Sequence, residues 1–263
     1  MPTLVLPPRF TEDTNLVRKA AIEAGWDVER LSGWRPPPEL RNADPVLYGE
    51  PLFAAVVADT LGLSLIEPPF HWLTTLSDHW TRRRIRFTTL GDARNECKRM
   101  FIKPADDKCF PARVYESGSE LPNTEVLPDE TPVLISEPVR WGVEFRCFIL
   151  NRTLQTHSIY SRGGELAQRD DGTWDSTVTE HERAQEFISN LLADDAVVIP
   201  PATVIDIGMI VDRGWAVVES NPAWGSGIYG CDPSLVLGVI RRACLARDHV
   251  TPGDAEWVPI RSA

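Results

Sequence analysis

The sequence predicts a mixed α/β fold in which an N-terminal α/β segment is followed by a strand-rich remainder. Residues 1–90 alternate short apolar runs of strand length with amphipathic helical runs, a pattern typical of a small sheet with helices on its faces. From Cys97 onward strands predominate, and polar turns join several of them. The chain has 263 residues, of which 43% are hydrophobic and 25% charged, so it can form one large domain or two to three smaller lobes.

The order of elements in the first ninety residues is β-α-β-β-α-β. The expected strands are residues 3–6, 26–31, 45–48 and 63–66, and the expected helices are 13–24 and 51–61. Gly25 and Gly62 follow the two helices, and glycine commonly ends a helix because it adopts the left-handed conformation. We therefore expect a small open sheet with helices on its faces.

A basic cluster follows a further helix that is expected to run to about Trp80. Its members are Arg82, Arg83, Arg84 and Arg86. Arginines at the end of a helix are commonly solvated, and the helix dipole favours them there. The alternative is a site for a substrate carboxylate or phosphate, and the residues alone leave both interpretations open.

The remaining residues are predicted to form strands and two helices. The expected strands are 99–103, 112–115, 133–137, 142–150 and 153–161, and the expected helices are 180–192 and 233–247. One hairpin turns at Asn151–Arg152. A second turns at the polar sequence Asp212–Arg213–Gly214, between two apolar runs.

Composition narrows the classes of partner and compartment. The net charge of −11 argues against nonspecific binding of nucleic acid, which requires a basic surface. The five cysteines lack CxxC spacing, which favours a reducing compartment and argues against zinc; they are Cys97, Cys109, Cys147, Cys231 and Cys244. No apolar run is long enough to cross a bilayer, and the first ten residues lack the plan of a signal peptide, so we expect a cytoplasmic protein without a membrane partner.

The second hairpin carries three oxygen-bearing side chains. Asp206 lies on its first strand, and Glu219 and Asn221 lie two residues apart on its second. Side chains alternate between the faces of a strand, so Glu219 and Asn221 share a face, and in a suitable register Asp206 joins them. Carboxylate and amide oxygens suit Mg²⁺, which is often shared with nucleotide phosphates. The alternative is an ordinary solvated hairpin face, and the apolar run Trp215–Val218 argues against it because a carboxylate on a buried strand is costly unless paired.

Residues of complementary chemistry precede this hairpin. Lys103 closes an apolar strand, where an ammonium can meet a phosphate, although lysines at strand ends often simply extend to solvent. Glu137 ends the next apolar strand, before Pro138–Val139, and could bind an adenine or a ribose. Glu144 and Arg146 share one face of a strand, either as site residues or as a cross-strand ion pair.

Taken in order, these residues resemble the ATP-grasp superfamily. The matching segments are Phe101–Pro104, Ile135–Val139, Val143–Arg146, Asp206 and Glu219–Asn221. The intervals from Glu137 to Glu144 and from Asp206 to Glu219 are similar to those of D-alanine–D-alanine ligases. The short chain and its Glu-Phe-Arg motif most resemble the small clade named for two arginines and a lysine. The resemblance implies a Rossmann-like pre-grasp α/β domain at residues 1–90 and an ATP-grasp domain at 91–263, with two α+β lobes at 91–141 and 142–263.

The resemblance also implies ATP and Mg²⁺ as cofactors. By this resemblance, the nucleotide would be held in this chain by Lys103, Glu137, Val139 and Glu144. The metal would be held by Asp206, Glu219 and Asn221. Family members typically phosphorylate a carboxylate, and an amine then attacks the acyl phosphate to give an amide. Arg146, or Arg162 beside Gly163–Gly164, would stabilise the charge that develops during transfer.

Departures from the family pattern leave alternatives open. The loop 105–109 replaces the usual glycine-rich loop and contains Asp106 and Asp107, which phosphates would repel unless Lys108 compensates. We therefore weigh three hypotheses: a carboxylate–amine ligase, a small-molecule kinase, and a nucleotide-binding module without catalysis. Expected partners are a small-molecule or peptide carboxylate and an amine. Their identity, and the oligomeric state, do not follow from the sequence. The arginine cluster and the loop Ala223–Tyr229, with Trp224 and Tyr229, are candidates for specificity.

Overall fold

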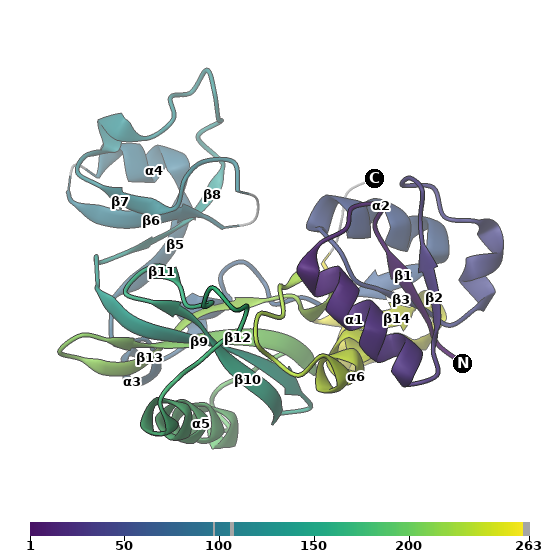
Figure 1. The fold of residues 1–263 in the computed structure, drawn as a ribbon. Helices are drawn as coiled ribbons and strands as arrows, with labels where there is room; N and C mark the ends of the chain where they lie inside the picture. Colours follow the sequence, from purple (N-terminus) through teal and green to yellow (C-terminus); the bar gives the residue numbers. More distant parts are fainter. Residues whose placement is uncertain (97, 106–107, 260–263) are drawn as a thin grey trace.

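The computed structural model describes residues 1–96, 98–105 and 108–259 (Figure 1). Its N-terminal part contains a sheet of three parallel strands in the order β2-β1-β3, built from β1 (Thr3–Leu6), β2 (Asp27–Arg30) and β3 (Pro45–Leu47). Helices α1 (Glu12–Glu23) and α2 (Pro51–Leu61) lie beside it. Parallel neighbours require crossover connections, which α1 supplies between β1 and β2.

Local signals fix the ends of these two helices. Thr11 caps α1 and forms a capping box with Thr14, which satisfies backbone amides that the first turn leaves unpaired. Helix α2 begins at Pro51, where the missing amide proton costs nothing, and ends at Gly62 in the left-handed conformation with φ 71°. Both helix predictions are therefore confirmed: α2 has the predicted bounds, and α1 begins and ends one residue earlier than predicted.

A small lobe follows, drawn at the upper left of Figure 1. Its antiparallel strands lie in the order β5-β8-β6-β7 and comprise β5 (Ile85–Thr89), β6 (Met100–Pro104), β7 (Arg113–Tyr115) and β8 (Pro132–Ser136). Helix α4 (Leu90–Asn95) packs on this sheet through Leu90 and Ala93. Two linkers, residues 82–84 and 137–140, connect the lobe to the rest of the chain.

The central sheet has five antiparallel strands in the order β11-β10-β9-β12-β13. They are β9 (Trp141–Leu150), β10 (Thr153–Arg162), β11 (Glu165–Leu166), β12 (Ala202–Ile210) and β13 (Gly214–Asn221). Helix α5 (Val178–Ala193) covers one face over a core that includes Phe145, Ile205 and Val217. Both predicted hairpins are confirmed, and Asn151 and Arg152 adopt the positive φ angles of a tight turn.

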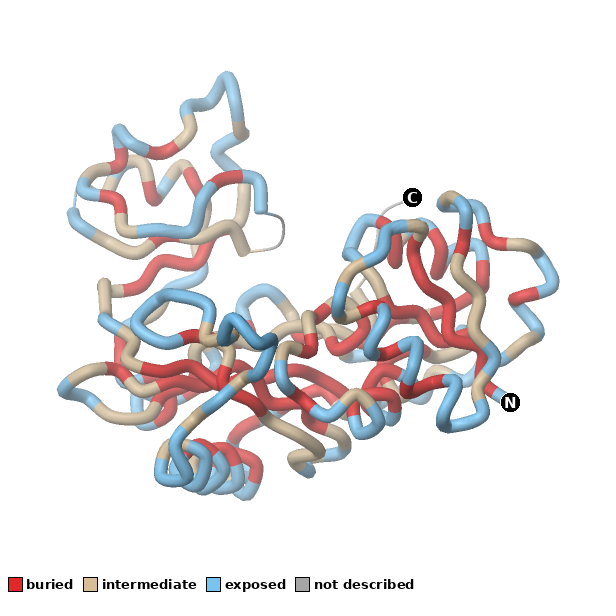
Figure 2. Tube along the Cα trace, in the orientation of Figure 1, coloured by how far each residue is buried: buried red, intermediate tan, exposed pale blue. Residues whose placement is uncertain are grey.

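The N-terminal part and the C-terminal segment share a second core. Helix α6 (Pro233–Ala243) packs Val236 and Ile240 into the cluster that contains Leu4 and Leu6. Strand β14 (Cys244–Ala246) then pairs with β4 (Leu63–Leu65) as a separate two-stranded sheet. Figure 2 shows these buried segments running through the interior of both regions.

Three predictions about elements were wrong. The last helix ends at Ala243 rather than Arg247, because Cys244 is extended and the chain pairs with β4. Strand β4 accordingly lies outside the β1–β3 sheet. The helix expected before Trp80 is two short pieces, η2 (Trp72–Thr75) and α3 (Asp78–Thr81), separated by extended Leu76. The remaining short helices are η1 (Pro38–Asn42), η3 (Gly118–Glu120), η4 (Ala223–Gly225), η5 (Arg247–His249) and α7 (Pro252–Ala255).

Within the described part of the chain, no helix has the length and apolar character needed to cross a bilayer.

Candidate nucleotide and metal site

The structure brings the three predicted metal ligands together on the hairpin of β12 and β13. Asp206 lies directly opposite Glu219 in the ladder. The amide nitrogen of Asn221 lies 3.3 Å from Oδ2 of Asp206 and 3.0 Å from Oε1 of Glu219. Because Ile205 and Ile207 belong to the core under α5, Asp206 projects from the opposite face of the sheet.

Arg146 neutralises Asp206 from the neighbouring strand β9. Its Nε lies 2.9 Å from Oδ1 and its Nη2 lies 2.6 Å from Oδ2, so one guanidinium binds both oxygens. Asp206 is fully buried, and Arg146 is 7% exposed. Burial alone would lower the pKa of Arg146, but the Asp206 carboxylate outweighs this effect and raises it. Arg146 therefore forms a cross-strand ion pair, and its partner on β12 is Asp206.

The rest of the Arg146 guanidinium is also engaged. Its Nη1 donates a hydrogen bond to the carbonyl of Gly227, which follows β13. The rings of Tyr160 and Tyr229 lie 5.5 and 4.8 Å from the guanidinium carbon, at cation–π distance. Arg146 therefore links β9, β12 and the loop after Asn221.

Lys103 reaches the site from the other lobe. It lies on β6, and its Nζ is 2.5 Å from Oε2 of Glu219 on β13. Burial acts to raise the pKa of Glu219, but Lys103 and the Asn221 amide outweigh burial and lower this pKa to about 2. This contact places the predicted phosphate-binding lysine beside the predicted metal ligands.

Glu144 lies on the same face of β9 as Arg146, and it is 9% exposed. Tyr160 donates to its Oε2 at 2.9 Å, and Ser161 donates to its Oε1 at 2.8 Å. Burial raises the pKa of Glu144, while these two hydroxyls oppose the shift. Tyr160 and Ser161 were not predicted, because alternation along a strand places consecutive residues on opposite faces. Both reach Glu144 here because the pairing of β10 with β9 is irregular between Ile159 and Ser161.

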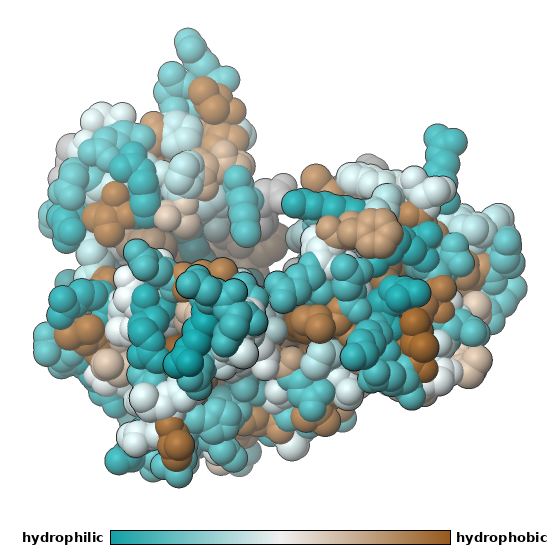
Figure 3. Space-filling model, in the orientation of Figure 1, coloured by the Kyte–Doolittle hydropathy of each residue, from teal (hydrophilic) through white to brown (hydrophobic). Residues whose placement is uncertain are grey.

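Glu137 and Val139 lie in the linker between β8 and β9. Glu137 forms ion pairs with Arg213 and Arg84, and Arg213 chiefly lowers the pKa of its carboxyl group. Val139 is half-buried. Both residues therefore lie where the small lobe joins the central sheet. The space-filling view shows a hollow between the small lobe and the N-terminal part of the chain (Figure 3).

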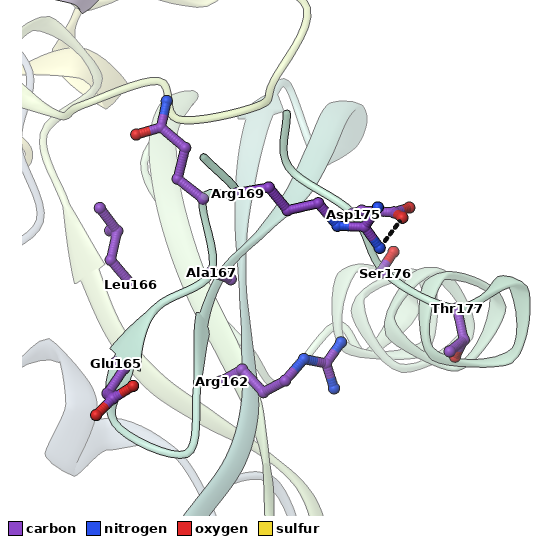
Figure 4. Close-up of a pocket in the computed structure, with 9 residues that line it drawn as sticks. Arg162, Glu165, Leu166, Ala167, Arg169, Asp175, Ser176 and Thr177 are labelled. Carbon is purple, nitrogen blue, oxygen red and sulfur yellow. Dashed lines mark ion pairs between the residues drawn. The ribbon is translucent and has the colours of Figure 1, made fainter. Parts of the chain in front are cut away.

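Arg162, the second candidate for charge stabilisation, forms its ion pair with Glu180 and not with the predicted metal ligands. It ends β10 and binds both oxygens of Glu180 on α5, at 2.7 and 2.9 Å. Figure 4 shows it lining a cavity of about 570 Å³ that Arg169, Asp175 and Thr177 also line. The structure therefore pairs Arg162 with α5 and does not bring it together with the predicted metal ligands.

The donor set fits Mg²⁺ in its chemistry. The Asn221 amide lies within hydrogen-bond distance of both carboxylates, and all three side chains carry the hard oxygen ligands that Mg²⁺ prefers. Asn221 presents its nitrogen here, and half a turn of the amide presents its oxygen. Among the described residues, no three His, Cys, Asp or Glu side chains gather into a metal site.

Several sequence interpretations need correction or stay outside the described residues. Trp224 is 1% exposed and donates to the carbonyl of Ile66, so it packs in the core and cannot contact a substrate. Arg83 is buried, so it is neither a solvated helix end nor a free anion site. Asp106 and Asp107 lie outside the described residues.

Solved structures share the fold at low sequence identity. The D-alanine–D-alanine ligase of Bacillus anthracis, in complex with ATP, superposes with a TM-score of 0.55 and 14% identity over 92% of this chain and 97% of that one. N5-carboxyaminoimidazole synthetase of Staphylococcus aureus superposes with a TM-score of 0.54 and 7% identity, over 94% of this chain and 78% of that one. The ATP-grasp ligase PsnB, in complex with a minimal precursor, superposes with a TM-score of 0.50 and 14% identity, over 91% of this chain and 99% of that one. Among curated proteins, none matches the chain.

The family of the chain follows from a match to a family model. Residues 80–239 match the model of the ATP-grasp domain that describes family 2 of the clade named for two arginines and a lysine. This range covers more than half of the chain and includes Lys103, Arg146, Asp206 and Asn221. The chain therefore belongs to family 2 of this clade of ATP-grasp domains.

Proposed function

We propose that this protein is an ATP- and Mg²⁺-dependent ligase that joins a carboxylate, from an amino acid or a peptide-like molecule, to an amine through an acyl phosphate. The observation that carries the proposal is the meeting of Lys103, from one lobe, with Glu219, Asn221 and Asp206, from the other. In an ATP-grasp domain this arrangement suits a nucleotide held between the lobes 91–141 and 142–263.

The nucleotide would be held by residues of both lobes. Lys103 would bind its phosphates, and Glu137, Val139 and Glu144 would meet the adenosine part near the linker and on β9. Mg²⁺, held by Asp206, Glu219 and Asn221, would supply charge neutralisation for the phosphates. Lys103 now forms an ion pair with Glu219, which is a proposed metal ligand. Binding of the nucleotide would therefore require the Nζ of Lys103 to move from Glu219 to a phosphate oxygen.

The two arginines would have different parts. Arg146 is held by Asp206, Gly227 and two tyrosine rings, so it would stabilise charge from a fixed position at the back of the site. Arg162 would act only after leaving Glu180, which binds it through two hydrogen bonds. Because Arg146 lies at the site in this structure and Arg162 does not, we propose that Arg146 stabilises the negative charge on the phosphoryl group during transfer.

The ligase route fits the chemistry of carboxylates. A carboxylate is a poor electrophile, and phosphorylation gives it a leaving group that an amine can displace. The proposal is supported by solved structures that share the fold, which include a D-alanine–D-alanine ligase and a D-cycloserine synthetase, DcsG, with a TM-score of 0.50.

The proposal can be tested without knowing the natural amine. The protein is incubated with ATP, Mg²⁺ and a panel of amino acids and short peptides, and hydroxylamine traps any acyl phosphate as a hydroxamate. A ligase gives a hydroxamate together with ADP. A stable phosphorylated product without hydroxamate indicates a kinase, and ATP binding without turnover indicates a binding module.

The metal assignment has a matched control on the same hairpin. Glu219→Ala and Asn221→Ala are expected to abolish ADP release, whereas Asp212→Asn, at the turn, is expected to retain it because Asn tolerates the left-handed conformation of that residue. Unchanged turnover in Glu219→Ala would show that the metal assignment is wrong.

A further inference from the structure

Arg83 is a buried arginine whose hydrogen bonds go to backbone carbonyls. Its Nη1 lies 2.7 Å from the carbonyl oxygen of Val217 and 3.1 Å from that of Thr81, and its Nη2 lies 2.9 Å from that of Val218. The side chain is wedged between the edge of β13 and Trp141, whose ring centroid lies 5.0 Å from the guanidinium carbon. Burial lowers the pKa of Arg83 to about 10, so the group stays charged at neutral pH.

The two carbonyls on β13 belong to a β-bulge. Asp206 opposes Glu219, but the next residue of β12, Ile207, opposes Val217, so Val218 is an extra residue in β13. A bulge shifts the alternation of side chains along its strand and is often found beside functional sites. The register therefore changes one residue before the proposed metal ligand Glu219.

The bulge decides which face Glu219 occupies. Val217 packs in the core under α5, and in a regular strand Glu219 would project to that same face. The extra residue reverses the alternation, so Glu219 and Asn221 project beside Asp206 on the face opposite α5. Without the bulge the two carboxylates would lie on opposite faces of the sheet.

Arg83 matches the backbone that the bulge creates. Consecutive carbonyls of a regular strand point to opposite sides, but those of Val217 and Val218 are bound by one guanidinium. Strand β13 is the edge of the central sheet among the described strands, so its outer carbonyls are open to a side-chain donor. The planar fork of arginine reaches both oxygens, whereas a lysine ammonium is a single point charge.

We propose that Arg83 is a positioning residue that holds the bulge at Val218 and thereby turns Glu219 and Asn221 into the site. The bulge is present in the structure, and only the link to the metal rests on the proposed function. Arg83 acts through the backbone of β13 and touches neither nucleotide nor metal.

The test compares Arg83 with its neighbour. Arg82 binds the carbonyl of Trp215, on the same edge of β13 but before the bulge, and so supplies a matched control. We would measure the affinity of wild type, Arg83→Met, Arg83→Lys and Arg82→Met for a non-hydrolysable ATP analogue by calorimetry, with Mn²⁺ or with EDTA. Arg83→Met and Arg83→Lys are expected to weaken the Mn²⁺-dependent part of binding by about 10- to 100-fold, as outer residues of metal sites do. Binding in EDTA, and binding by Arg82→Met, should be unchanged.

Two further measurements separate positioning from general stability. In a Glu219→Gln background, Arg83→Met should cause no further loss of Mn²⁺-dependent binding, because its effect passes through Glu219. Amide hydrogen exchange at residues 216–221 should accelerate in Arg83→Lys and stay unchanged in Arg82→Met. Three results would each overturn the inference. The first is an equal loss of binding in Arg83→Met and Arg82→Met, and the second is an additive loss in the Glu219→Gln background. The third is unaltered hydrogen exchange in Arg83→Lys. If wild type binds the analogue equally with Mn²⁺ and with EDTA, the proposed metal site fails, and the exchange measurement still decides whether Arg83 holds the bulge.

Discussion

Lys103 and Glu219 form an ion pair, 2.5 Å from Nζ to Oε2, that joins the small lobe to the edge strand of the central sheet. Lys103 is proposed to bind a phosphate and Glu219 a metal ion, so in this structure each residue holds the group with which the other is proposed to bind its ligand. Nucleotide binding would exchange this single contact for two, one between Lys103 and phosphate and one between Glu219 and the metal.

Lys103→Met should therefore weaken nucleotide binding. Loss of a charged hydrogen bond to phosphate is expected to reduce affinity by about tenfold or more. Calorimetry with ATP and Mg²⁺ measures the change, and Lys98→Met, which alters an exposed lysine of the same lobe, serves as the control. Equal affinities for the two variants would remove Lys103 from the site.

Breaking the Arg146–Asp206 pair should destabilise the fold. Asp206→Asn leaves a buried guanidinium without its counter-charge, and Arg146→Met leaves a buried carboxylate, each at a cost of about 3–5 kcal/mol. The double variant should lose less than the sum of the two single losses, because neither charge remains. Urea unfolding of the four proteins measures this, and additive losses would contradict the pairing.

The stacked pair His157 and His181 predicts a loss of stability in acid. Their ring centroids lie 4.0 Å apart, and burial together with the neighbouring histidine lowers the pKa of His157 to about 4. The unfolded chain binds a proton at an ordinary histidine pKa of about 6.5, so this contribution to stability is complete above that pH. It should disappear as the pH falls from about 6.5 to about 4.

Thermal unfolding between pH 7 and pH 4 checks this expectation. His157→Phe keeps an aromatic ring against Phe145 and removes the titrating group, so its melting temperature should fall less than that of wild type. His71→Phe, which alters a histidine that contacts Phe87 in another part of the molecule, should follow wild type. The same pH dependence in His157→Phe and wild type would exclude His157 as the cause.

The loop after Asn221 depends on a glycine. A Cβ on Gly230 would lie 2.4 Å from Oγ of Ser158 and 2.5 Å from Cβ of Trp174, closer than packed atoms approach. Gly230→Ala should therefore cost about 1–3 kcal/mol and displace the loop that Arg146 holds at Gly227. Gly253→Ala, where the Cβ would meet nothing within 4 Å, is the control in chemical denaturation. Equal stability of the two variants would contradict this packing.

Much of the site was predictable because its residues follow strand periodicity. The turn Asp212–Gly214 indicated the hairpin, which places Asp206 and Glu219 on neighbouring strands. Lys103 was predictable as the end of an apolar strand. The partner of Arg146 was not, because the pairing of β9 with β12 joins strands more than fifty residues apart, and no local pattern encodes such a pairing.

The bulge and its arginine lay beyond local patterns for a related reason. Simple alternation places Glu219 on the same face as Val217, and the extra residue Val218 becomes visible only in the paired sheet. Arg83 was expected either at a solvated helix end or in an anion site, because its partners are carbonyls of β13, far along the chain. Likewise, β14 could not be separated from α6 until its partner β4 was known.

The most direct test of the central claim is formation of a hydroxamate coupled to release of ADP. Wild type with ATP, Mg²⁺, hydroxylamine and the acid panel is expected to produce both in equal amounts with at least one acid. Glu219→Ala should produce neither, and Asp212→Asn should match wild type. ADP formation without hydroxamate across the whole panel, or hydroxamate from Glu219→Ala at the wild-type rate, would contradict an acyl-phosphate ligase built on this hairpin.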